Sequence, residues 1–164
     1  LQEVAYPELG PLAQEVLDVL ADMANVRALE ETSGHMPSML ELLGLVGDRM
    51  AILCGHDEVV LPALASGASG AILASANVVP DVWVELFRAV RAGDLAKARR
   101  LQMGVLGLAR MFMGRGGRQA IRAALEMMGL LAQRAYAILS KGARESIRAE
   151  LEKIQALRER ERLI

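Results

Sequence analysis

Short, unbroken apolar segments alternate with helical segments through the first 80 residues, and this alternation restricts the possible folds more than any other feature. Unbroken apolar strands are typical of parallel sheets that are covered on both faces. Strand–helix–strand order with short turns therefore predicts an α/β fold, a parallel sheet joined by right-handed crossovers. The expected strands are residues 25–29, 49–54 and 71–75, and the expected helices are residues 12–23, 36–46 and 57–65.

The sequence after Pro80 is expected to be helical. Apolar residues recur there at helical spacing, and glycines divide them into separate helices. Alternating charges near the end of the chain (RERER) are typical of a solvated helix face. We therefore expect two parts, βα units over residues 1–80 and C-terminal helices over residues 81–164. The expected helices are residues 81–92, 94–112, 118–131 and 143–162.

A sheet of so few parallel strands is not complete by itself, because both edges carry unpaired backbone groups. A whole (β/α)8 barrel typically requires about 250 residues, whereas this chain has 164. We therefore expect the sheet to be completed by a missing N-terminal half or by a second copy of the chain. We also expect a homo-oligomer.

Charge and composition exclude several classes of partner. The formal net charge is −1 and aromatic residues make up 3% of the chain, so no basic surface for nucleic acid is expected. The uncharged stretch 59–80 is interrupted by proline, glycine and serine, which argues against a membrane span. Cys54 is the only cysteine, so we expect no disulfide framework, no cysteine metal site and a reducing, cytoplasmic location. We also expect no other metal site and no cofactor.

Several short motifs follow one another in the order and at the spacing of one known family. Segment 25–34 (NVRALEETSG) ends in a polar turn, and segment 55–58 reads GHDE. Segment 67–80 combines GASGAI with a later AN and a proline. Segments 93–98 (GDLAKA) and 121–125 (IRAAL) fall near or within the expected helices. Together these motifs resemble the Schiff-base lyase family that includes N-acetylneuraminate lyase and dihydrodipicolinate synthase.

The resemblance implies both a fold and a chemistry. The fold is the C-terminal half of a (β/α)8 TIM barrel, about strands five to eight, followed by a C-terminal helical bundle. In the family, a lysine at the end of the sixth strand condenses with the ketone of pyruvate or a related 2-oxo acid. The resulting iminium is an electron sink for making or breaking a carbon–carbon bond. A tyrosine at the end of the fifth strand relays protons, and the site lies at the carboxyl ends of the strands.

This sequence departs from the family at the residues that carry the chemistry. Glu30 occupies the lysine position, and a carboxylate cannot form an imine with a carbonyl carbon. Alignment without gaps places Gln2 at the tyrosine position, whereas Tyr6 fills it only if the intervening segment has shifted. Both alternatives stay open. The lysines of the chain all fall in its expected C-terminal part, residues 81–164, and they are Lys97, Lys141 and Lys153.

Other residues match the ligand pocket of the family. Thr32 and Ser33 follow the strand that ends at Glu30, and they are either ligand contacts or a simple turn. Gly55 permits close approach of the backbone. Asp57 and Glu58 resemble contacts of neuraminate lyases with the sugar chain, and the alternative is that both lie at a helix N-terminus, where Asp57 caps the helix and the dipole favours acidic residues.

Three further residues have competing interpretations. Ile72 resembles the residue that packs beside the imine in the family, and plain barrel core is the alternative. His56 is interpreted as a turn histidine rather than a base or metal ligand. Cys54 is interpreted as a small buried hydrophobe rather than a nucleophile.

Three hypotheses for function follow. The chain is part of a lyase acting on a 2-oxo acid, a non-catalytic homologue that binds a small 2-oxo acid or acidic sugar, or a half-barrel that self-assembles. Glu30 would repel the carboxylate of pyruvate unless it were protonated or paired. Imine catalysis by this chain is therefore not expected.

Overall fold

A computed structural model describes residues 2–3, 10–114, 117–132 and 139–163 of the chain. The chain divides into two compact units, Leu1–Leu73 and Ala74–Ile164. The division lies before the expected boundary at residue 80. Trp83 explains the difference, because its Nε1 donates to the Oγ of Ser75 at 2.8 Å and ties that segment to the following helix.

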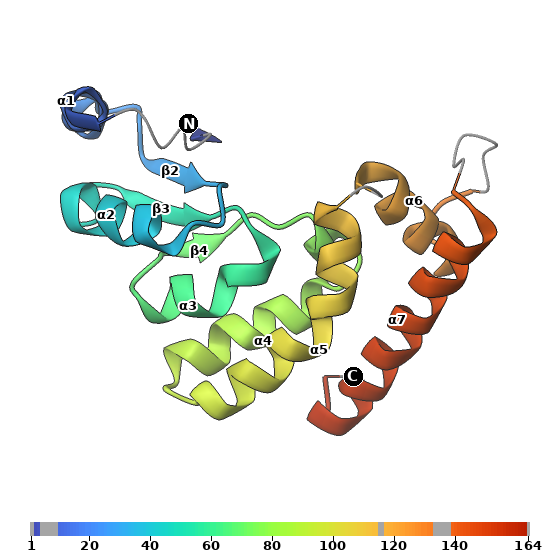
Figure 1. Ribbon diagram of the computed structural model, residues 1–164. Coiled ribbons are helices and arrows are strands. Elements are labelled where there is room, and N and C mark those ends of the chain that lie inside the picture. Colours follow the sequence, from blue (N-terminus) through green and yellow to red (C-terminus); the bar gives the residue numbers. More distant parts are fainter. Residues whose placement is uncertain (1, 4–9, 115–116, 133–138, 164) are drawn as a thin grey trace. The chain divides into compact units, whose positions relative to one another are not determined.

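The first unit contains a parallel sheet with helices between its strands, as the alternation of segments predicts (Figure 1). Strand order is β1-β2-β3-β4, so each strand pairs with the next one along the chain. Consecutive βα units of a (β/α)8 barrel have the same order. The elements are β1 (Gln2–Glu3), α1 (Gly10–Asp22), β2 (Ala28–Glu31), α2 (Met36–Val46), β3 (Ala51–Cys54), the 3₁₀ helix η1 (Asp57–Val59), α3 (Val60–Ala65) and β4 (Gly70–Ala71).

The last strand is shorter than the apolar pattern predicts. The pattern indicates a strand over residues 71–75, but β4 ends at Ala71 and Ser75 begins the 3₁₀ helix η2 (Ser75–Asn77) of the second unit. The carbonyl of Ser75 accepts backbone hydrogen bonds from Val78 and Val79, both at 2.9 Å. These bonds turn the chain away from the extended conformation.

Side chains alternate between the two faces of the sheet. Leu29 of β2 and its register partner Ile52 of β3 are buried, as is Met39 of α2. Both α2 and α3 contact β3, so these helices cover the buried face. Glu30 and Leu53 come one residue later in each strand, project from the opposite face and are only half-buried. One face of the sheet is therefore covered, and the face with Glu30 is partly open.

The second unit is built from helices, as predicted for the residues after Pro80. Leu86, Leu101 and Ile154 come from three of these helices, and all are fully buried. The helix expected to reach residue 131 ends at Met127, because Gly129 adopts a φ of 74° and terminates it. After η2, the second unit contains the helices α4 (Pro80–Arg91), α5 (Leu95–Met113), α6 (Gly117–Met127) and α7 (Lys141–Glu161).

Glycines allow α5 and α7 to approach closely. A Cβ at Gly104 would lie 2.6 Å from the Cδ2 of Leu157, and a Cβ at Gly107 would overlap the carboxylate of Glu150. Larger residues at either position would require the side chain of Leu157 or Glu150 to move. Within the described residues, no helix combines the length and apolar character that a membrane crossing requires.

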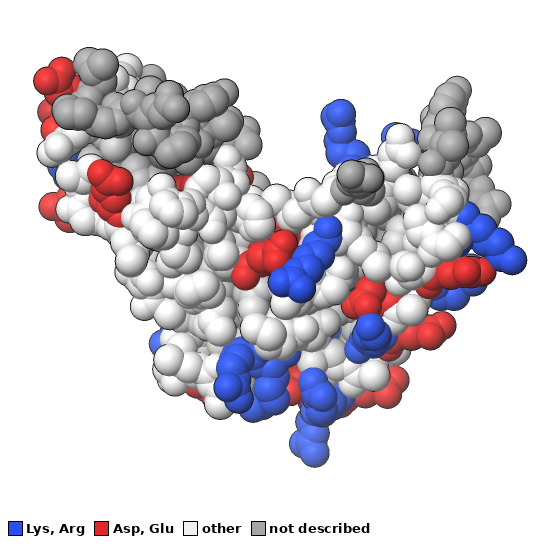
Figure 2. All heavy atoms as spheres, viewed as in Figure 1, with Lys and Arg blue, Asp and Glu red and all other residues white. Residues whose placement is uncertain are grey.

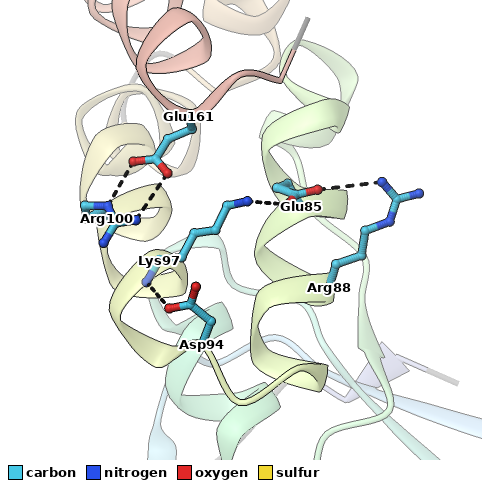
Figure 3. A network of polar contacts seen from close by, with 6 residues as sticks. All are labelled: Glu85, Arg88, Asp94, Lys97, Arg100 and Glu161. Atoms are coloured by element: carbon cyan, nitrogen blue, oxygen red, sulfur yellow. Dashed lines mark hydrogen bonds and ion pairs between the residues drawn. The ribbon is translucent and has the colours of Figure 1, made fainter.

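Ion pairs connect α7 to the earlier helices of the second unit. Arg158 donates from Nε and Nη2 to both carboxylate oxygens of Asp81 in α4, at 2.8 and 2.7 Å. Arg100 of α5 donates to both oxygens of Glu161, at 2.9 and 3.3 Å (Figure 3). The expectation of a solvated RERER face is therefore wrong for Arg158 and Glu161, whose side chains are 18% and 7% exposed. Acidic and basic side chains intermingle over this part of the surface (Figure 2).

Replacement of Asp81 by asparagine is expected to destabilise the protein by about 1 kcal/mol at neutral pH, the upper range for a partly exposed ion pair. Burial opposes ionisation of Asp81, but the hydrogen bond and charge of Arg158, together with backbone N–H donors, outweigh burial and lower the pKa of this carboxyl below its ordinary value. A lowered pKa in the folded state stabilises the protein above about pH 4. This contribution is lost as the pH falls through the lowered pKa.

Urea unfolding at pH 7 and at pH 2 measures this effect. The matched control is Glu152→Gln, which changes an exposed acid of the same helix α7 and should leave the free energy of unfolding unchanged. Equal losses in the two variants at pH 7 would contradict the assignment. A difference between Asp81→Asn and the unmodified protein that persists at pH 2 would contradict it as well.

Candidate functional site

The residues that match the family pocket meet at the carboxyl ends of β2 and β3. Parallel pairing aligns the Cα of Gln2 with Glu30, Glu30 with Leu53, and Leu53 with Gly70. Aligned residues of neighbouring strands belong to the same face of a sheet. Glu30 is therefore one of four aligned residues, one from each described strand, and it belongs to one of the two central strands.

The carboxylate of Glu30 lies against the turn that follows β3. A Cβ added at Gly55 would be 2.6 Å from the Oε1 of Glu30 and 2.5 Å from the Cγ2 of Thr32. The backbone N–H of Gly55 donates to the carbonyl of Glu31 at 2.6 Å and draws the turn toward β2. Glu30, Thr32 and Gly55 thus form one contact cluster into which no side chain at position 55 fits without displacement.

Glu31 organises the turn that contains Thr32 and Ser33. Its Oε1 accepts from the backbone N–H of Ser33 at 2.8 Å and also from the Ser33 hydroxyl. The Oγ of Ser33 in turn accepts from the backbone N–H of His35 at 3.0 Å. These bonds favour the turn interpretation for Ser33, while Thr32 remains beside Glu30 and Gly55.

Glu31 is also the residue of this site that the motifs did not reveal. Its side chain is 1% exposed, and its Oε2 has no hydrogen-bond partner among the residues that the structure describes. A buried carboxylate is costly unless it is paired or hydrogen-bonded. The available signal in the sequence was an acidic residue at the covered face of an otherwise apolar strand.

His56, rather than Asp57, is the capping residue of the 3₁₀ helix after β3. The Nδ1 of His56 accepts from the backbone N–H of Glu58 at 3.4 Å. Asp57 lies in the first turn of η1 and is not its N-cap, so the prediction that it caps a helix is wrong; it is fully buried, whereas Glu58 is half-buried. A Cβ at Gly34 would lie 2.8 Å from the His56 ring, which places this imidazole beside the turn after β2.

Cys54 ends β3 as a fully buried free thiol. Burial raises the pKa of this thiol to about 11, and the charges of Glu31, Asp57 and Glu30 contribute to the increase. Nucleophilic cysteines require accessible thiolate, so the geometry supports the interpretation of Cys54 as a small buried hydrophobe.

Ile72 is not buried in the described chain, so its interpretation as barrel core stays a prediction. Its side chain is 54% exposed, although its backbone N–H donates to the carbonyl of Cys54 at 2.9 Å and continues the ladder beyond β4. The physical reason is that the inner face of a barrel is buried only where further strands surround it. Of the two alternatives for the family tyrosine, Gln2 lies in β1 and Tyr6 lies outside the described residues.

Every lysine of the chain lies in a helix of the second unit. Lys97 Nζ donates to Glu85 Oε1 at 2.6 Å (Figure 3). Lys153 Nζ donates to Glu150 Oε1 at 2.5 Å, and Lys141 is exposed at the start of α7. No lysine therefore belongs to a strand of the sheet, where the family places its imine-forming amine.

Two other kinds of site are possible, a metal centre and a cavity of the second unit, and neither includes the residues that match the family pocket. In the part of the chain that the structure describes, no group of three or more His, Cys, Asp or Glu side chains is arranged to hold a metal ion. An open cavity of about 460 Å³ lies between α5 and α7 and contains none of the residues that match the family pocket. Two of its charged residues, Glu150 and Lys153, pair with each other.

Replacement of Gly55 by alanine is expected to destabilise the protein by about 1–3 kcal/mol, because the added methyl group overlaps Glu30 and Thr32. Gly44→Ala is the matched control, since a Cβ at that position in α2 meets no atom within 4 Å. A helix interior favours alanine over glycine by roughly 0.5–1 kcal/mol, so the control should be neutral or stabilising. Similar unfolding free energies for the two variants would contradict the contact cluster.

Alkylation of Cys54 by iodoacetamide at pH 8 is expected to be slow in the folded protein, because burial both shields the thiol and keeps it protonated. The same reagent should react rapidly once the protein is unfolded in urea. Quantification of the modified peptide by mass spectrometry measures both rates. Equal rates in the folded and unfolded protein would show that the thiol is accessible.

Comparison with known proteins agrees with this arrangement. The dihydrodipicolinate synthetase family profile matches residues 10–154. A 4-hydroxy-tetrahydrodipicolinate synthase from Thermomicrobium roseum is 36% identical over 119 residues, which cover 73% of this chain and 39% of that protein. The enzyme of the same name from Geobacter metallireducens is 35% identical over 115 residues, covering 70% of this chain and 40% of the relative. The chain thus spans about two fifths of the length of these curated relatives.

Solved structures give the same result at the level of the fold. The 4-hydroxy-tetrahydrodipicolinate synthase from Methylacidiphilum fumariolicum SolV has a TM-score of 0.80 at 26% identity, covering 90% of this chain and 51% of that one. Dihydrodipicolinate synthase from Aquifex aeolicus has a TM-score of 0.75 at 24% identity, which shows the fold alone, over 85% of this chain and 49% of the other. The chain belongs to the dihydrodipicolinate synthetase family, and its described part has the fold of part of a (β/α)8 barrel.

Proposed function

We propose that this chain forms the C-terminal half of a lyase-type barrel, with a helical bundle after it, that takes a small ligand without forming an imine. The ligand would bind at the carboxyl ends of β2 and β3. The observation that carries this proposal is the position of Glu30. Its carboxylate lies next to Gly55 and Thr32, on the partly open face of the sheet.

The chemistry follows from the functional groups. An amine adds to a ketone and loses water to give an imine, whereas a carboxylate has no nitrogen and cannot do so. Lys97 and Lys153 lie in helices of the second unit, and each pairs with a carboxylate, Glu85 and Glu150 respectively. This chain therefore lacks the group that starts catalysis in Schiff-base lyases.

The relatives are named as 4-hydroxy-tetrahydrodipicolinate synthases, and their activity supports a small-molecule site for this chain. The resemblance of the motifs points to pyruvate, a related 2-oxo acid or an acidic sugar. Glu30 disfavours an unmodified 2-oxo acid, because two carboxylates repel each other where burial reduces screening by water. We therefore favour a binding or assembly role over carbon–carbon lyase activity.

Assembly is the second candidate function, and two features of the first unit favour it. Both edge strands, β1 and β4, contain two residues each, so little of the barrel is closed by the described sheet. The face with Glu30 is partly open, and Ile72 is exposed beside it. We propose that further strands, from an N-terminal half or a second copy of the chain, complete the sheet in a homo-oligomer.

Borohydride reduction in the presence of pyruvate tests the imine directly. The unmodified protein is expected to gain no adduct, because no amine occupies the site. The Glu30→Lys variant is expected to gain one pyruvate unit less one oxygen atom, found by peptide mapping on residues 25–34. Glu41→Lys is the matched control, since Glu41 is an exposed acid of α2.

Either of two results would contradict the proposal. An adduct on the unmodified protein at Lys97, Lys141 or Lys153 would show that a helix lysine performs the chemistry. Equal labelling of Glu30→Lys and Glu41→Lys would show that position 30 has no special access to pyruvate.

A further inference from the structure

The open cavity between α5 and α7 has the size of a ligand site, although the proposed function does not use it. Its volume is about 460 Å³, and small-molecule sites typically enclose roughly 300–1,000 Å³. Gly104 and Gly107 of α5 line it where they lie against the side chains of Leu157 and Glu150 of α7. The absence of side chains at these two positions leaves room for a ligand above the contact between the helices.

One part of the cavity wall is apolar and reaches the surface of the second unit. Met103 and Leu106 both line the cavity, and residues three apart lie on the same face of a helix. The side chain of Met103 is 60% exposed, whereas Leu157 opposite it on α7 is buried. An apolar group that covered Met103 would be favourable, because it would remove apolar surface from water.

The charged part of the wall is mainly basic. Its charged residues are Arg110, Lys153 and Arg160 on the basic side and Glu150 on the acidic side, which leaves two positive charges in excess. Lys153 donates to Glu150, but the lysine side chain is exposed, and such a pair contributes little to stability and can exchange partners. Arg160 lies 3.6 Å from Glu161, which has a closer partner in Arg100 at 2.9 Å. The cavity therefore attracts an anion.

We propose that this cavity binds a carboxylate with an unbranched apolar chain, as in a fatty acid. The chain covers Met103 and Leu106, and the carboxylate accepts hydrogen bonds from the basic side chains of α7. Lys153 and Arg160 are seven residues apart, so they lie on one face of α7 and are separated by roughly 10 Å along its axis. This inference goes beyond the proposed function, because the cavity lies in the second unit and contains no residue of the site at the strand ends.

Charge distinguishes this occupant from the alternatives. A second copy of the chain that packed cavity against cavity would bring two positive surfaces together, which is unfavourable. A neutral apolar ligand would cover Met103 but would offer the basic side chains no partner. A carboxylate with an apolar chain satisfies both parts of the wall, since lysine and arginine form charge-assisted hydrogen bonds with carboxylate oxygens.

Three probes with the same chain and different head groups test the proposal, namely octanoate, n-octanol and n-octylammonium. Each is titrated into the intact protein below its micelle-forming concentration, and binding is followed by NMR or calorimetry. Octanoate is expected to bind about fivefold more tightly than n-octanol, the upper range for an ion pair at an exposed site. The positively charged n-octylammonium is expected to bind most weakly.

Two pairs of variants locate the site. Lys153→Gln combined with Arg160→Gln should abolish the preference for octanoate over n-octanol, whereas Lys141→Gln combined with Arg148→Gln should retain it. The control removes the same number of exposed cations from α7, outside the cavity. Met103→Gln should weaken octanoate and n-octanol alike by about fourfold, the value of about one buried methylene group. Met113→Gln, on exposed α5 outside the cavity, should change neither.

Three outcomes would overturn the inference. Octanoate could fail to bind, or could bind no better than n-octanol or n-octylammonium. The two double variants could lose the preference equally, which would attribute it to the overall charge of the protein. Met103→Gln and Met113→Gln could have the same effect, which would place the chain elsewhere on the surface. All the replaced side chains are exposed, so the variants are expected to remain folded.

Discussion

The parallel register between β2 and β3 is the constraint on which the site depends. It pairs Ala28 with Ala51 and continues to Glu31 with Cys54, so the two strands end together. A shift by one residue would move Glu30 to the covered face and Glu31 to the open one. The contact of Glu30 with Gly55 is a consequence of this register, because the turn after β3 passes directly over the end of β2.

We propose that the fold keeps the position of the family's site while the charge at position 30 is reversed. The glycine turns that the family motif contains are present, and Gly34 with a φ of 73° still adopts the left-handed conformation that the turn after β2 requires. Where relatives are expected to hold an amine, Glu30 holds a carboxylate. The scaffold and the imine chemistry are therefore separable, since strand register fixes where a side chain lies but not what it can react with.

Much of the fold was predictable because the local signals were strong. Helix α2 has the predicted bounds, Met36–Val46, where a proline in the first turn and a glycine after the last residue limit the helix. The prediction for β4 is too long, since a run of apolar residues does not distinguish a strand from the η2 turn that Ser75 forms. The core assignment of Ile72 stays a prediction, because its burial depends on strands beyond the described sheet.

The candidate site was predictable in its position and less so in its internal bonds. The order of the motifs alone predicts that Glu30, Thr32 and Gly55 lie together, and the structure places them in contact. The hydrogen bonds from Ser33 to Glu31 depend on side-chain conformations of the turn that spacing alone does not specify. Burial of Asp57 likewise depends on packing around the start of η1.

A crystal structure of the intact protein grown with pyruvate would test the central claim most directly. We predict that Glu30 lies beside Gly55 on the inner face of the sheet, with no covalent density between the protein and the ketone carbon of pyruvate. Continuous density from a lysine side chain to that carbon would contradict the account, because it would show that the chain retains an imine-forming amine.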